Sequence, residues 1–128
     1  MASRILQVIE TAYRATLEEQ DDPALWLAQS LRNSGLDVHV LLRGNAVNYA
    51  VRGQDASGLV FGDRRQTHPP HLEADLARLV KAGVHVYLAE DDLGLHGIRA
   101  DELIEGITPI RTSGLPALFS EFEQVWQW

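Results

Sequence analysis

Apolar positions along this chain follow two kinds of pattern, and the two kinds alternate. Short apolar runs typical of buried strands cover residues 4–9, 37–43, 84–88, 107–110 and 124–128. Apolar residues at helical spacing predict helices over residues 23–33, 72–80 and 113–122, with shorter ones over 46–51 and within 99–106. Such alternation indicates right-handed crossovers between parallel strands. The pattern therefore predicts one α/β domain over residues 1–128, a three-layer α/β/α sandwich around a mostly parallel five-stranded sheet.

Local signals support these boundaries. Asp22 and Pro23 suit the start of a helix, because a carboxylate accepts hydrogen bonds from first-turn amides and proline fits the first helical position. Gly35 and Gly83 follow apolar stripes and predict helix ends. Pro109 removes a backbone donor from its strand, which predicts an edge position in the sheet.

Two apolar features are expected at the surface. Trp26 falls opposite the apolar stripe Ala24, Leu27, Ala28 and Leu31 of its helix, and Leu59, Val60 and Phe61 interrupt the otherwise polar loop 53–70. Aromatic residues are enriched where subunits meet, so these residues are candidates for an interface between chains. The alternative is that the long loop folds back over Trp26 within one chain.

Polar residues gather where the predicted strands end, and the carboxyl edge of an open parallel sheet is where ligands bind. Glu10 follows the first strand, Asn45 the second, and an acidic run the third. The loop 11–21 begins at the same edge and is either a solvated connection or a lid. The candidate ligand-binding residues are Glu10, Tyr13, Asn45, Glu90, Asp91, Asp92 and His96.

Structural roles compete with binding at these positions. Asn45 either faces a ligand or caps the short helix after the second strand. Asp91 and Asp92 suit the N-cap and first turn of a short helix over residues 93–96. Carboxylates with one imidazole, such as His96, can also hold Mg²⁺, Mn²⁺ or Zn²⁺. No three-ligand spacing demands a metal, so no metal or other cofactor is predicted.

The other histidines are interpreted as structural. His39 lies within the second strand, which favours a hydrogen-bonded packing residue. His68 and His71 resemble a metal-ligand pair, but they lack a third ligand at an established spacing and are interpreted as an exposed pair.

Composition removes several classes of function. The 128 residues contain no cysteine, which excludes disulfides, thiolate nucleophiles and thiolate metal sites. A net charge of −7 argues against nucleic acid as a partner. The first apolar run is too short for a signal peptide or a membrane span, so a cytoplasmic protein without a membrane partner is expected. No Gly-rich phosphate loop or Ser/His/Asp order is present.

Three stretches together resemble the DsrE-like (DsrE/DsrF, sulfur-relay) proteins: residues 41–47 with Gly53-Gln54, residues 82–98, and residues 118–125. The resemblance implies the same α/β fold and a trimer or hexamer of like or paralogous subunits. It also implies persulfide chemistry on a cysteine after the strand 84–88, at positions that match Ala89 and Asp92 here. Neither residue can form a persulfide, so the resemblance supports the fold and withdraws the activity.

Three classes of function remain. The favoured one is a non-catalytic DsrE-like subunit that assembles with itself or a paralogue and presents a binding edge, with a sulfur-relay protein as a further candidate partner. The alternative is a small-molecule or metal-binding protein, including a hydrolytic one, that uses the acidic edge. A structural domain without a binding role is the third. Ala89 joins the candidate site residues through the resemblance alone.

Overall fold

A five-stranded, all-parallel sheet forms the centre of the molecule. The computed structural model describes residues 4–12, 23–54, 60–65, 67 and 71–128. The strands are β1 (Arg4–Ile9), β2 (Asp37–Leu42), β5 (His85–Ala89), β6 (Ile107–Ile110) and β7 (Gln124–Gln127), in the order β6-β5-β2-β1-β7. Every neighbouring pair is parallel. The prediction of the five strands is confirmed, and β6, which contains Pro109, lies at an edge as expected.

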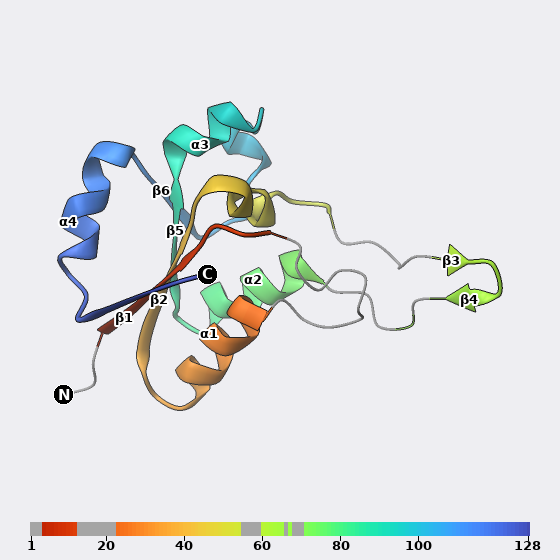
Figure 1. Ribbon diagram of the computed structural model, residues 1–128, viewed down its shortest axis with the longest axis horizontal. Helices are drawn as coiled ribbons and strands as arrows, with labels where there is room; N and C mark the ends of the chain where they lie inside the picture. Colours follow the sequence, from red (N-terminus) through yellow and green to blue (C-terminus); the bar gives the residue numbers. More distant parts are fainter. Residues whose placement is uncertain (1–3, 13–22, 55–59, 66, 68–70) are drawn as a thin grey trace.

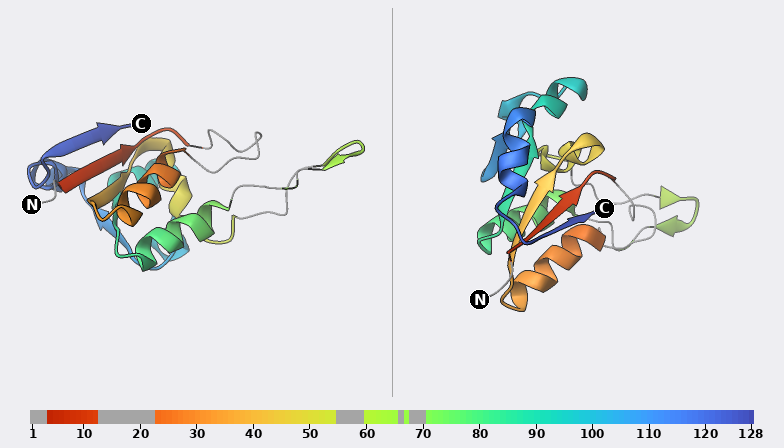
Figure 2. Two further views of the ribbon diagram at one scale, coloured as in Figure 1. Left: turned by 90° about the horizontal axis from the view of Figure 1, so that it is seen from below. Right: turned by 60° about the vertical axis from the view of Figure 1, so that its left-hand side comes forward.

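Helices cover both faces of the sheet, which confirms the three-layer sandwich (Figure 1). One face is covered by α1 (Pro23–Asn33), α2 (Leu72–Lys81) and the 3₁₀ helix η1 (Gly44–Ala50). The opposite face is covered by α4 (Leu115–Phe119). We call these the α1–α2 face and the α4 face. The views in Figure 2 show α4 apart from the two longer helices, with the sheet between them.

Three short helical elements connect strands and helices along the chain between β5 and α4. α3 (Glu90–Leu95) follows β5 directly at the carboxyl edge of the sheet (Figure 1). The 3₁₀ helices η2 (Ala100–Glu102) and η3 (Thr112–Gly114) precede β6 and α4 respectively. An antiparallel hairpin of β3 (Val60–Phe61) and β4 (Arg64–Arg65) projects away from the sandwich in Figures 1 and 2.

Helix ends agree with prediction better than helix faces do. Gly35 and Gly83 have φ values of 87° and 89° and stand just past α1 and α2, as predicted. The predicted stripe of α1 was partly wrong, because Leu25 is buried at 2% exposure while Leu27 and Leu31 are only partly buried. α1 packs against α2 as well as the sheet, so its buried face is turned toward Leu25.

Three other predictions need correction. The helix expected over residues 113–122 is shorter, with η3 leading into α4, which ends at Phe119. The short helix expected over 46–51 is a 3₁₀ helix that begins at Gly44. The region 53–70, predicted as an irregular loop, contains the β3–β4 hairpin.

Candidate functional site: the carboxyl edge of the sheet

The acidic run at this edge belongs to the first turn of α3. β5 ends at Ala89, which has extended φ and ψ values of −69° and 102° and is the N-cap residue of α3. Glu90, Asp91 and Asp92 form the first turn that follows. The predicted first-turn placement of Asp91 and Asp92 is confirmed, but the helix begins three residues before the predicted start at position 93. Neither carboxylate is the N-cap of its own helix.

Asp92 instead binds the loop that follows β2. Its Oδ2 accepts a hydrogen bond of 2.7 Å from the backbone N–H of Gly44, the first residue of η1. Gly44 has a φ of 56°, which an L side chain rarely adopts, and its backbone turns beside Glu10. The carboxylate therefore satisfies a first-turn amide of a neighbouring helix, which has no partner within that helix.

Asp91 binds the loop on the other side of β5. Its Oδ2 accepts a hydrogen bond of 2.9 Å from the backbone N–H of Thr112, the first residue of η3. Hydrogen bonds from the side chain and backbone of Thr112 lower the pKa of Asp91, and the charge of Arg111 acts in the same direction. Since β5 lies between β2 and β6, α3 joins the loops after both neighbouring strands.

The other candidates occupy the edge without converging on one point. Glu10 Oε1 forms an ion pair of 3.2 Å with Nε of Arg43, a residue that sequence reasoning missed. Asn45 is exposed, and the predicted capping role was wrong, because the N-cap residue of η1 is Arg43, whose own side chain makes no capping hydrogen bond. Glu90 is exposed, as is His96 just past the end of α3. Tyr13 lies outside the described residues.

At this edge, Asp91 and Asp92 use their carboxylates to hold neighbouring loops. The carboxylates of Asp91 and Asp92 are occupied by backbone donors, and the side chain of Ala89 is buried at 2% exposure. Within the part of the chain that the structure describes, no three His, Asp or Glu side chains are grouped so that they could hold a metal ion. Of the His68 and His71 pair, only His71 is described, and it is exposed.

A second polar cluster lies on the α4 face near the amino ends of the strands. His39 is buried at 4% exposure, with Nε2 3.0 Å from Oδ1 of Asp37 and Nδ1 3.4 Å from the hydroxyl of Tyr87. Its ring stacks on His85 and meets the edge of Phe122. The interpretation of His39 as a hydrogen-bonded packing residue is confirmed.

Burial governs the protonation of this cluster. Burial lowers the pKa of His39, and the charges of His85 and Arg4 act in the same direction against the opposing influence of Asp37. Burial also raises the pKa of Tyr87, as does the charge of Glu121. Both rings are therefore held in their neutral forms near neutral pH, which suits packing better than acid–base catalysis.

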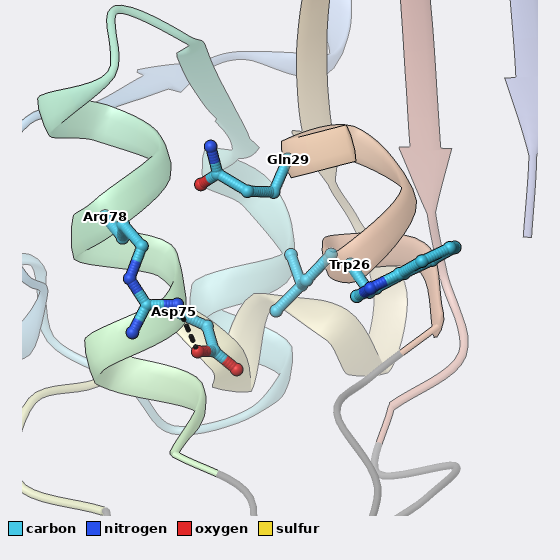
Figure 3. A pocket seen from close by; sticks show the side chains of 5 residues that line it. Trp26, Gln29, Asp75 and Arg78 are labelled. Atoms are coloured by element: carbon cyan, nitrogen blue, oxygen red, sulfur yellow. Dashed lines mark hydrogen bonds and ion pairs between the residues drawn. The ribbon is translucent and has the colours of Figure 1, made fainter. Parts of the chain in front are cut away.

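A small pocket lies between α1 and α2 (Figure 3). Its volume is about 50 Å³, well below the several hundred Å³ typical of a small-molecule site. Trp26 and Gln29 stand on the α1 side, and Asp75 pairs with Arg78 on the α2 side at 3.2 Å. The buried Leu25 completes the lining.

The predicted interface residues are exposed wherever they are described. Trp26 is 59% exposed, and Val60 and Phe61 are each 64% exposed. The alternative, in which the long loop folds back over Trp26, stays a prediction, because residues 55–59, 66 and 68–70 of that loop lie outside the described residues. Leu59 lies outside the described residues.

Comparison with known proteins shows a shared fold. No family model and no curated protein matches this chain. The chain is similar to the crystal structure of the ychN protein from E. coli, with a TM-score of 0.74 and 24% identity over 98% of this chain and 99% of the other. It is also similar to two proteins of unknown function. MTH1491 from Methanobacterium thermoautotrophicum has a TM-score of 0.63 and 17% identity over 98% of this chain and 99% of that one. BT1422 from Bacteroides thetaiotaomicron has a TM-score of 0.65 and 16% identity over 97% of this chain and 94% of that one.

Among the described residues, no helix is long and apolar enough to span a membrane.

Proposed function

We propose that this chain is a non-catalytic DsrE-like subunit that assembles with copies of itself or with a paralogue in the cytoplasm. Trimers and hexamers are the expected assemblies, and a sulfur-relay protein is a further candidate partner. Two sources support the kinship: the three stretches of sequence that resemble the family, and a fold shared with the ychN protein over nearly the whole chain.

The observation that carries the assembly role is the exposure of large apolar side chains, of which five are exposed among the described residues, including the three described residues predicted to lie at an interface. Trp26, Val60 and Phe61 leave most of their surface in water. Burying a large apolar side chain is worth about 1.5–3 kcal/mol, so a contact that covers these residues is favoured. Exposed apolar groups of this kind are typical of protein–protein contact sites.

The non-catalytic part of the proposal rests on what replaces the family's cysteines. Ala89 places a methyl group in the core, and Asp92 uses its carboxylate to hold the amide of Gly44. Neither group can attack a sulfur donor or carry a transferable sulfur atom. The remaining edge residues, among them the exposed Glu90 and His96, form the binding edge that the subunit presents.

Two measurements test the proposal. Light scattering at micromolar concentration should give the mass of a trimer or hexamer, and a monomeric mass would remove the assembly role. Mass spectrometry after incubation with inorganic polysulfide should find the protein unmodified. An Asp92→Cys variant provides the control for the reagent, since it introduces a thiol at a family cysteine position. A stable sulfur adduct on the wild-type chain would contradict the non-catalytic part.

A further inference from the structure

We propose that two copies of this chain join their sheets at β7, with the two β7 strands antiparallel across a two-fold axis. This inference rests on the proposed self-association and names the surface and the register of one contact within it. β6 and β7 are the edge strands of the five-stranded sheet, and among the described residues no strand pairs with the outer side of either. Val125 on β7 is one of the five exposed large apolar side chains.

The two edge strands differ in how open they are to a further strand. Proteins commonly protect an edge strand with proline or charged residues, because an unprotected edge pairs with other chains. β6 contains Pro109, whose ring replaces a backbone N–H. β7 has the sequence Gln-Val-Trp-Gln, which contains neither proline nor a charged residue. The edge of β7 is therefore the one that a further strand can extend.

The backbone of β7 turns part of its polar groups away from the sheet. Both polar groups of Trp128 bond the β1 side, its N–H to Val8 at 2.9 Å and its carbonyl to Glu10 at 3.0 Å. Polar groups of successive residues in a strand alternate in direction, so those of Val125 and Gln127 point outward. Val125 is 46% exposed and Gln127 is also exposed. The left view of Figure 2 shows β7 in dark blue at the outer margin of the molecule, beside β1 in red.

These outward groups select the register of the pair. With Val125 opposite Gln127 of the second copy, two residue pairs each exchange both N–H···O bonds, which gives four hydrogen bonds. Trp126 then lies at the two-fold axis, opposite its own copy in a non-hydrogen-bonded pair. A register with Val125 opposite its own copy forms only one such hydrogen-bonded pair. The axis is perpendicular to the sheet, so the α1–α2 face and the α4 face each continue onto the same face of the second copy.

Charge makes a second copy a suitable occupant of this edge. The chain carries −7, so two copies repel one another over most of their surfaces. The side chains of residues 124–128 are all uncharged, so no like charges lie opposite one another in the proposed register. Glu123 is three positions from the axis, which separates its two copies by about 20 Å, well beyond the screening length of about 8 Å. Two acidic chains can therefore approach here, and identical antiparallel strands supply matching donors and acceptors.

A single cysteine tests the contact directly, because the wild-type chain has none. Non-hydrogen-bonded residues that face each other in an antiparallel pair have Cα atoms about 4.5 Å apart, which suits a disulfide. Trp126→Cys should therefore give a disulfide-linked dimer as its main product on mild oxidation, measured on a non-reducing gel. Gln124→Cys, on the same face of β7, is the matched control. Its two copies lie about 14 Å apart in this register and should stay reduced.

Charge variants test the same contact at exposed side chains. Val125→Lys combined with Gln127→Lys places lysines opposite lysines, and Val125→Glu combined with Gln127→Glu places glutamates opposite glutamates. Light scattering should find half of the wild-type mass for each double variant alone. An equimolar mixture should recover the wild-type mass, because lysines then face glutamates. Trp126 packs against the apolar core, so this second test decides the matter if Trp126→Cys fails to fold.

The outcomes separate the two proposals. A monomeric wild-type chain would overturn both the self-association and the β7 contact. A trimeric wild type would overturn the contact alone, because a two-fold contact requires an even number of copies. An oligomer in which Trp126→Cys stays reduced, or in which Gln124→Cys cross-links as readily, would do the same. So would charge variants that keep the wild-type mass or fail to recombine. If the edge instead receives an extended segment of a different protein, Trp126→Cys will not cross-link to its own copy.

Discussion

The two faces of the sheet are covered to very different extents. Among the described residues, the α1–α2 face has a buried apolar cluster of 20 residues, whereas the cluster on the α4 face has five. The difference follows from the lengths of the covering helices, since α1 and α2 have 11 and 10 residues and α4 has five. A short helix cannot shield a whole sheet face, so part of the α4 face stays close to water.

The two faces also differ in whether their buried polar side chains have hydrogen-bond partners. On the α4 face, Asp37, His39 and Tyr87 form a hydrogen-bonded chain, and Arg4 lies 5.0 Å from the ring centroid of Phe122. On the α1–α2 face, the side-chain amide of Gln7 is fully buried, and neither of its polar atoms has a hydrogen-bond partner within the part of the chain that the structure describes. The buried His39 is partnered by Asp37, whose side chain is 45% exposed, whereas the buried Gln7 meets no such residue among those described.

The largest expected effect comes from removing core leucines on the two faces. Leu76→Ala, on the α1–α2 face, should lower the free energy of unfolding by about 3–5 kcal/mol, because the dense surroundings cannot collapse into the cavity. Leu118→Ala, on the α4 face, should cost about 2 kcal/mol, since α4 can shift toward the sheet. Urea denaturation measures both, with the exposed Ala77→Ser as the control. Equal losses would mean that the faces are equally rigid.

The second prediction is a gain in stability at Gln7. Gln7→Met keeps an unbranched side chain of similar length and removes the unpartnered amide, so the free energy of unfolding should rise by about 1–3 kcal/mol. The matched control is Gln127→Met, at an exposed position of β7, which should change little. A loss of stability would show that the amide of Gln7 has a partner in solution, such as a buried water molecule.

The third prediction concerns pH and the α4 face. Because the pKa of His39 is lowered below its ordinary value of 6.5, the folded state favours the neutral ring. Its contribution to stability is therefore complete above pH 6.5 and is lost as pH falls from there toward the folded pKa. One such histidine changes stability by at most about 1.4 kcal/mol per pH unit.

Urea midpoints measured between pH 5 and pH 8 test this assignment. The groups around His39 are Asp37, Arg4, His85, Tyr87 and Phe122. His39→Phe should flatten the slope below pH 6.5, since Asp37 keeps its ion pair with Arg4. His96→Asn, at an exposed histidine, should leave the profile unchanged. A slope that survives in His39→Phe would assign the titration to another group.

The smallest predicted effects are local. They concern the two carboxylates of α3 that bind backbone amides of neighbouring loops. Asp92 holds the start of η1 on the α1–α2 face, and Asp91 holds the start of η3, which leads to α4. Asp92→Ala should lower the free energy of unfolding by about 1 kcal/mol and speed hydrogen exchange at the amide of Gly44. Asp91→Ala should speed exchange at Thr112 alone. Each variant is the control for the other, and faster exchange at both amides in either variant would show that α3 opens as one unit.

Much of the architecture was predictable from local pattern. The alternation of apolar runs and stripes predicted the five strands of the parallel sheet, the α/β/α layers and the extents of α1 and α2. Glycines at positions 35 and 83 predicted helix ends because only a residue without a side chain adopts their positive φ values at little cost. These features depend on a residue and its near neighbours in sequence, so the sequence alone was sufficient to determine them. The same reasoning placed Glu10 and the acids of α3 at one edge of the sheet.

Tertiary structure decided which groups meet. The sequence placed Asp91 and Asp92 after a strand, but their partners, the amides of Thr112 and Gly44, depend on β5 lying between β6 and β2. The apolar stripe 115–122 favoured a longer helix, but α4 ends early because the chain turns there, with the N–H of Glu123 bonded to the carbonyl of Arg4, and enters β7 beside β1. Strand order and turns of this kind depend on residues far apart in the chain, whose proximity no local period encodes.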